Sequence, residues 1–218
     1  MAPIYDCSVE AELLTGMRLA RVAIGRGDLV VVPTDTVYGL AADAFNPGAV
    51  QKLIDAKGRT RQSPPPVLIP GIPTLDALAE TVPDEVRALV EKFWPGALTI
   101  ILPAQSSLQW DLGETRGTVA LRMPSNRIVL ELLSETGPLA VSSANLTGQP
   151  AATTAIGAEE MLGEAVSIYL DDGEGGTVAS TIVDATALSL PEGKLRIVRE
   201  GAISADEIRA IVGAERCA

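Results

Sequence analysis

Two cations, Lys57 and Arg59, stand two residues apart with Gly58 between them. In an extended backbone, residues i and i+2 point to the same side, so both charges would face one anionic ligand. Gly58 allows the backbone to come close to that ligand. The alternative is a helix C-terminus, because residues 51–56 have a helical pattern and cations suit that end of the helix dipole. Taken alone, the spacing favours the helix C-terminus.

Further polar residues follow the predicted strands. Thr34 and Thr36 come after a buried apolar run, and in open α/β sheets ligands bind at such strand ends. The alternative is that these hydroxyls bond the local backbone of a turn. Arg122 lies near the end of an apolar strand, where an arginine is costly unless it meets an anion or water. The remaining members of the set are Thr118, Ser143, Asn145, Ser180 and Arg199. Separated cations with many neutral donors suit a phosphate-bearing ligand and a second polar substrate.

The composition excludes several classes of function. The chain has 17 Lys and Arg against 28 Asp and Glu, a net charge of −11, so a broad electrostatic grip on nucleic acid is not expected. It has no histidine, which excludes Ser-His-Asp and Cys-His catalysis and most zinc enzymes. There is no Walker A loop and no dinucleotide-binding glycine pattern. Catalysis would therefore rest on positioning and electrostatics.

The chain reads as a soluble cytoplasmic protein. Its 218 residues are 47% hydrophobic, enough for a substantial core. No signal pattern and no apolar run long enough to span a membrane are present. Cys7 and Cys217 lie at opposite ends of the chain; they would pair only if the termini meet, and a reduced state is the default.

Helical and strand patterns alternate along the chain. Helices are predicted over residues 10–24, 47–56, 74–80, 83–93, 126–135, 153–162 and 204–212, and strands over 29–32, 67–69, 97–102, 118–122, 139–141, 166–170, 180–184 and 195–199. This alternation predicts one α/β domain over residues 1–218 with a largely covered sheet, but no strand order. The polar segment 104–117 is either a mobile lid or a surface connection, and the second is commoner.

The motifs together resemble those of the YrdC-like threonylcarbamoyl-AMP synthases. They occur in the family's order and cover roughly residues 10–203. The motifs are Pro33–Leu40, Lys57–Arg59, Trp94–Gly96, Ser143–Gly148 and Ser180–Asp184. The resemblance implies a single-domain twisted mixed sheet flanked by helices, with a large concave active-site cavity.

The resemblance also implies an activity. Such enzymes make L-threonylcarbamoyladenylate from L-threonine, bicarbonate and ATP and release pyrophosphate. A downstream transferase complex then modifies the adenosine beside the tRNA anticodon, so stable direct tRNA binding is not expected. Mg²⁺ would accompany ATP, with no protein ligand to the metal apparent.

The motifs carry residue roles onto this chain. Lys57 and Arg59 would be catalytic. The ATP side would comprise Lys57, Arg59, Ser63, Thr118, Asn145, Thr153 and Arg199. The L-threonine side would comprise Thr36, Arg122, Ser143 and Ser180.

Three positions depart from the family pattern. Asp35 stands where the family usually has Glu, and residues 63–65 read Ser-Pro-Pro where Asn-Pro-Leu is usual. Leu68 stands where some relatives have His, so its side chain cannot bind a polar substrate. Ser63 can still donate a hydrogen bond.

Two other readings remain. One is an RNA-binding module of the same fold without catalysis, which a salt-dependent interaction with tRNA would support. The other is the carbamoyl-transfer domain of hydrogenase maturation proteins, but those chains carry zinc-binding cysteine clusters that this chain lacks. The short form of the synthase, without an additional C-terminal domain, is the expectation.

Overall fold

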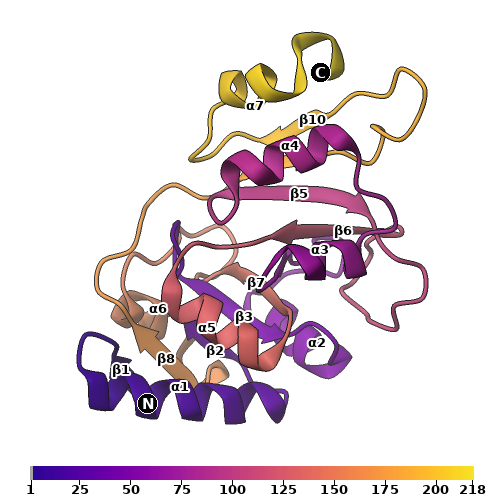
Figure 1. Cartoon of the computed structure of the whole chain (residues 1–218). Coiled ribbons are helices and arrows are strands. Elements are labelled where there is room, and N and C mark those ends of the chain that lie inside the picture. The colour runs from indigo at the N-terminus through magenta and orange to yellow at the C-terminus, as the bar shows by residue number, and fades with distance from the viewer. Residues whose placement is uncertain (1) are drawn as a thin grey trace.

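The computed structural model describes residues 2–218, and its ten strands form one mixed sheet (Figure 1). The strands are β1 (Ile4–Asp6), β2 (Val30–Val32), β3 (Gly39–Asp43), β4 (Val67–Leu68), β5 (Leu98–Pro103), β6 (Thr118–Arg122), β7 (Leu139–Ser143), β8 (Ile168–Asp171), β9 (Thr181–Asp184) and β10 (Arg196–Arg199). Their order across the sheet is β1-β8-β2-β3-β7-β4-β6-β5-β9-β10. Neighbours pair in parallel at β1-β8, β8-β2, β4-β6 and β5-β9, and antiparallel elsewhere.

Seven α-helices in the described residues cover this sheet. They are α1 (Glu10–Gly25), α2 (Pro47–Ala56), α3 (Ile72–Leu78), α4 (Asp84–Phe93), α5 (Arg127–Thr136), α6 (Ala155–Leu162) and α7 (Ala205–Val212). At one end of the sheet, α1 and α5 pack in one apolar cluster, while α2 and α6 contribute to another. At the other end, α3, α4 and α7 pack around β5 and β6 (Figure 1). Since both faces are covered, β2 is buried at every position, as its continuous valine run predicts.

The predicted α/β class, flanking helices and single sheet are confirmed, and most element bounds agree within two residues. Two strands were not predicted, β1 and β3. The sequence Gly39–Asp43 contains glycine and alanines, which have low strand propensity, so its local pattern indicates no strand. It becomes one because it pairs along its whole length with β7, about 100 residues away in the chain.

Helix α3 also differs from its prediction. It starts at Ile72, two residues earlier than expected, because Pro73 fits the first helical turn. Two short 3₁₀ turns, at 163–165 and 214–216, were not predicted.

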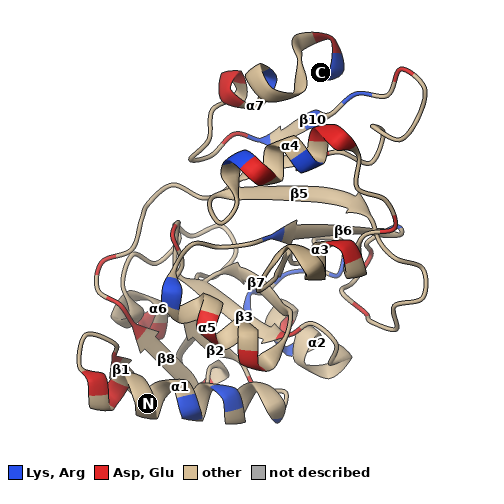
Figure 2. Cartoon of the chain, viewed as in Figure 1, with Lys and Arg blue, Asp and Glu red and all other residues tan. Residues whose placement is uncertain are grey.

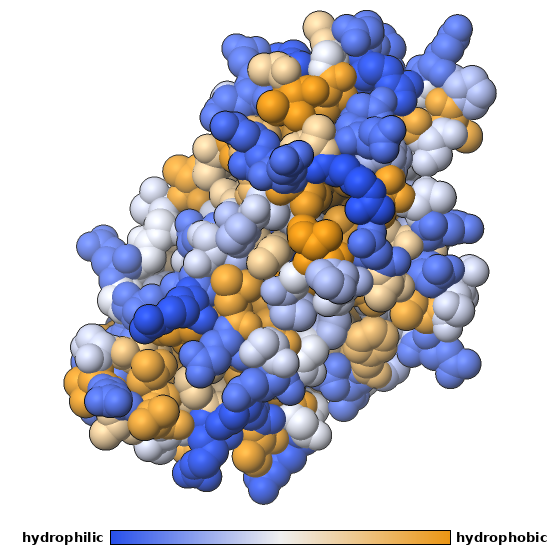
Figure 3. All heavy atoms as spheres, in the orientation of Figure 1, coloured by the Kyte–Doolittle hydropathy of each residue, from blue (hydrophilic) through white to orange (hydrophobic). Residues whose placement is uncertain are grey.

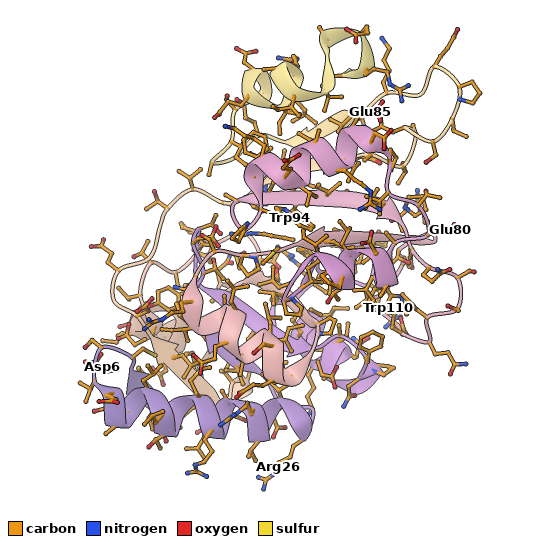
Figure 4. All side chains as sticks on the ribbon, viewed as in Figure 1. Asp6, Arg26, Glu80, Glu85, Trp94 and Trp110 are labelled. Carbon is orange, nitrogen blue, oxygen red and sulfur yellow. The ribbon has the colours of Figure 1, made fainter. Side chains whose placement is uncertain are left out.

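Residues 104–117 form a packed connection. The Trp110 ring stacks on Phe45 with 5.4 Å between centroids, and Leu112 is buried. Asp111 forms an ion pair with Arg61, just beyond the cation turn. Figure 4 shows Trp110 at the margin of the molecule and Trp94 at the level of β5. These anchors favour the surface connection over the mobile lid.

The two cysteines are free and do not meet. Cys7 is buried in the cluster beneath α1, whereas Cys217 is buried in the cluster around β5 and α7. The termini lie at opposite ends of the molecule (Figure 1). Within residues 2–218, no helix has the length and apolar character that crossing a membrane requires.

The packing of α5 gives a stability prediction. Leu132→Ala removes a fully buried side chain from the contact between α5 and α1, so we expect a loss of about 2–5 kcal/mol in the free energy of unfolding. Leu14→Ala on α1 is the matched control, because that side chain is 64% exposed and its loss should change stability by about 0.5 kcal/mol or less. Urea unfolding measures both; equal losses would contradict the assigned packing.

Candidate active site

A cavity of about 430 Å³ opens between the two ends of the sheet. Its wall includes the segment before β3, the end of β7, the start of β5, the end of β6, and residues around β9 and β10. Seven of the predicted site residues line it: Thr36, Arg59, Ser63, Arg122, Ser143, Ser180 and Arg199. None of its lining residues is acidic. Three guanidinium groups therefore face one space with no carboxylate in its wall.

Arg122 is the most deeply buried of these arginines, at 6% exposure. Its Nη2 lies 2.8 Å from Asp35 Oδ1, Nε donates to Gly96 O at 3.0 Å, and Nη1 donates to Thr36 Oγ1 at 2.9 Å. The anion that the sequence required is thus Asp35, whose Oδ1 also accepts from the Ser125 N–H. Burial lowers the pKa of Arg122, and Asp35 opposes that shift. Nη2 touches Asp35 without hydrogen-bond alignment and is a buried atom with no hydrogen-bond partner among the described residues.

The hydroxyls of Thr34 and Thr36 lie in a turn beside Arg122. Thr34 bonds the local backbone, as the turn alternative for these residues predicted. Thr34 Oγ1 donates to Val37 O at 2.6 Å and accepts from the Thr36 N–H. Its 3.1 Å bond to Thr36 Oγ1 is therefore donated by Thr36. Thr36 is 2% exposed, and its oxygen also accepts from Arg122. Thr36 keeps one lone pair for a ligand.

Arg59 and Arg199 hold less buried positions on the cavity wall and bond only neutral oxygens. Arg59 Nη1 donates to Ser142 Oγ at 3.0 Å. Arg199 donates to Ser180 O from both Nε and Nη2, at 3.1 and 2.7 Å. Burial lowers the pKa of both arginines, and for Arg199 the positive charges of Arg122 and Arg59 lower it further. An anion bound among the three would relieve that repulsion.

Lys57 lies behind this wall. Its side chain is 1% exposed, and Nζ donates to Ser143 O, to Asn145 O at 2.7 Å and to Asn145 Oδ1 at 3.2 Å. Of the two alternatives for the cation pair, the helix C-terminus is confirmed and the extended backbone is not: α2 ends here, and Gly58 has φ +61°. The cation pair is thus a helix C-terminus, yet both charges still contact the segment that follows β7. A role for Lys57 toward ATP stays a prediction.

Three other predicted ATP residues lie outside the main cavity. Thr118 lines an adjoining cavity of about 240 Å³, which is mostly apolar and shares Pro64, Pro66 and Ile182 with the first. Asn145 is buried against Lys57, and the carbonyl oxygen of Thr153 accepts from the Gly175 N–H. Their assignment to ATP stays a prediction.

Among the cavity residues that the sequence reasoning missed, Ser142 and Thr99 contact predicted site residues. Ser142, next to Ser143, holds Arg59. Thr99 lies inside the apolar strand β5, 1% exposed, and contacts Ser180. A polar residue on a strand otherwise made of buried apolar ones was the available signal for Thr99.

The cavity does not fit a protein-bound magnesium site. Mg²⁺ prefers oxygen ligands from carboxylates, and the lining residues provide none. Within residues 2–218, no cluster of three His, Cys, Asp or Glu side chains could hold a metal ion.

The buried Lys57 gives a pH prediction. Burial, assisted by the charge of Arg59, lowers the pKa of Lys57 to about 7. Above pH 7 the unfolded chain then binds a proton that the folded chain does not, so this group's contribution to stability rises between pH 7 and 9. Lys57→Met should flatten that rise in urea unfolding. Lys52→Met, an exposed lysine on the same helix, should keep it.

Comparison with known proteins places these features in a family. The Sua5/YciO/YrdC family model, described as telomere recombination, matches residues 22–201. A putative threonylcarbamoyl-AMP synthase of Mycobacterium leprae is 47% identical over 98% of this chain and 95% of that protein. The threonylcarbamoyl-AMP synthase of Bacillus subtilis is 37% identical over 89% of this chain and 56% of that protein.

The fold agrees with solved structures. P. abyssi Sua5 complexed with L-threonine superimposes with a TM-score of 0.88 and 33% identity, covering all of this chain and 62% of that one. E. coli YciO shares the fold at a TM-score of 0.81 and 21% identity, covering 95% of this chain and 100% of that one. The chain belongs to the Sua5/YciO/YrdC family.

Proposed function

We propose that this chain is a threonylcarbamoyl-AMP synthase, an enzyme that converts L-threonine, bicarbonate and ATP to L-threonylcarbamoyladenylate, pyrophosphate and water. The observation that carries the proposal is the cavity wall, which holds Arg59, Arg122 and Arg199 and no carboxylate in a protein of net charge −11. The relatives named for this activity include one that matches nearly the whole chain.

The chemistry explains why such a wall is useful. The threonine amine adds to bicarbonate and loses water, which gives a carbamate. A carbamate oxygen then attacks the α-phosphorus of ATP, and the bond to pyrophosphate breaks. Nucleophile and triphosphate are both anions, so fixed cations must hold them together and stabilise the leaving group. No histidine is needed, because positioning and charge supply the catalysis.

The geometry suggests how the substrates divide the cavity. Arg122 and the hydroxyls of Thr36 and Ser180 form its inner part, where a small amino acid with two opposite charges would fit. Arg59 and Arg199 are nearer the surface and suit the phosphates. The adjoining apolar cavity along Thr118 suits the adenine ring. Mg²⁺ would enter bound to the phosphates of ATP.

The product implies a following step. A mixed anhydride of carbamate and phosphate is an acylating agent, so a second enzyme that presents the tRNA adenosine would consume it. The net charge of −11, with acidic residues spread over the fold (red in Figure 2), disfavours stable tRNA binding by this chain alone.

Pyrophosphate release tests the function directly. With ATP and Mg²⁺ present, we expect release only when L-threonine and bicarbonate are both added. Omission of Mg²⁺ should also abolish it. Release without threonine would point to another acceptor. ATP binding without release under any combination, together with salt-dependent tRNA binding, would support the RNA-binding reading instead.

Arg59→Ala tests the phosphate assignment. Loss of one charged contact should raise the KM for ATP about 10- to 100-fold, because a hydrogen bond to a charged group contributes about 1.5–3 kcal/mol. The KM for L-threonine should change much less. Arg87→Ala on α4 is the control, because that arginine pairs with Asp76 on the surface. An unchanged KM for ATP in Arg59→Ala would remove this residue from the site.

A further inference from the structure

Thr99 is a buried hydroxyl at the back of the cavity. It lies on β5 and is 1% exposed, among leucine and isoleucine residues that fill the core. A hydroxyl buried without a partner is strongly disfavoured, so its hydrogen bonds must be accounted for. In the part of the chain that the structure describes, its side-chain partner is Ser180 Oγ, at 2.9 Å.

The direction of this bond follows from the third group present. Arg199 Nη2 donates to Ser180 Oγ at 3.2 Å, and a guanidinium can only donate. If Ser180 gave its hydrogen to Thr99, the Thr99 hydrogen would have no acceptor among the described protein groups. If Thr99 donates, both lone pairs of Ser180 Oγ are filled and the Ser180 hydrogen remains. Ser180 lines the cavity, so that hydrogen is directed to a ligand there.

The hydroxyl of Thr36, elsewhere on the cavity wall, has the reverse hydrogen-bonding polarity. Thr36 gives its hydrogen to Thr34, because Thr34 has already given its own to Val37 O. Thr36 therefore offers a lone pair to a ligand, whereas Ser180 offers a hydrogen. An α-amino acid carries both complementary groups, an amine that donates and a carboxylate that accepts. Arg122 donates to Thr36 Oγ1 and lines the same cavity, so it adds a positive charge that a bound carboxylate would meet.

We propose that Thr99 is a positioning residue that fixes the Ser180 hydroxyl as a hydrogen-bond donor to the carboxylate of the amino-acid substrate. Thr99 is only 1% exposed at the cavity wall, and in this proposal it acts through Ser180. The identity of that substrate as L-threonine rests on the proposed function.

Two substitutions at one position separate polarity from packing. Thr99→Val keeps the shape and removes the hydroxyl, so Ser180 is free to turn toward other acceptors. We expect the KM and Kd for L-threonine to rise about 3- to 10-fold, the effect of one neutral hydrogen bond, with kcat nearly unchanged. Thr99→Ser restores the hydroxyl and should restore the KM. A merely structural role would lower the melting temperature and would not give this separation of KM from kcat.

The dependence on Ser180 is tested by a double-mutant cycle. In a Ser180→Ala background, Thr99→Val should have no further effect on the Kd for L-threonine, because the hydroxyl it orients is gone. Thr136→Val, at the end of α5, removes a half-buried hydroxyl away from the cavity and should leave the Kd at the wild-type value. Additive effects of the two cavity substitutions would overturn the proposal.

Calorimetric binding of L-threonine distinguishes this proposal from the function it rests on. Wild-type binding that weakens in Thr99→Val and returns in Thr99→Ser supports the positioning role. Equal binding by the wild type and Thr99→Val overturns that role and leaves the proposed function intact. No binding by the wild type overturns both.

Discussion

The buried contact between Arg122 and Asp35 is the constraint on which the site depends. Arg122 comes from β6, and Asp35 comes from the turn that leads into β3. In the strand order these two strands are separated by β7 and β4. Transfer of either ion alone from water into the protein would be strongly unfavourable. The pair therefore fixes how the turn lies against β6, and with it the position of Thr36. Asp35 stands where the family usually has the longer Glu, and its Oδ1 still lies 2.8 Å from Arg122 Nη2.

Apart from this pair, the cations of the site are held by uncharged oxygens. Serine hydroxyls and backbone carbonyls orient Lys57, Arg59 and Arg199 without neutralising them. A carboxylate partner would have stabilised each cation in the free protein, but an anionic substrate would then have to displace it. Neutral acceptors leave the positive potential available. One energetic consequence is that, beyond the effect of burial, the charges of Arg122 and Arg59 lower the pKa of Arg199. Such a preorganised set of charges is what a reaction between two anions requires.

The sequence predicted the elements better than their assembly. Amphipathic helices and valine-rich strands are local patterns, and their bounds agree with the structure. Strand β3 could not be predicted, because Gly39–Asp43 is a strand only through its partner β7. The polar clusters converge as expected, but Lys57 lies behind the wall because the left-handed Gly58 turns the chain between the two cations. A hydroxyl on an apolar strand indicates only that it needs a partner, so the role of Thr99 could not be predicted. That role depends on Ser180, which Thr99 contacts, and on Arg199, which donates to Ser180 in the folded chain.

The charge distribution also selects the size of the ligand. The outer helices carry both acidic and basic residues, and the visible surface has apolar areas among hydrophilic ones (Figures 2 and 3). A polyanion such as tRNA, lying across the surface, meets the field of a protein with net charge −11. A nucleotide that enters the cavity is within contact of the arginines, whereas the outer carboxylates are screened over about 8 Å at physiological salt. A negative net charge combined with a cationic cavity thus admits a small anion while disfavouring a large one, which suits an enzyme that uses ATP and leaves tRNA to a second protein.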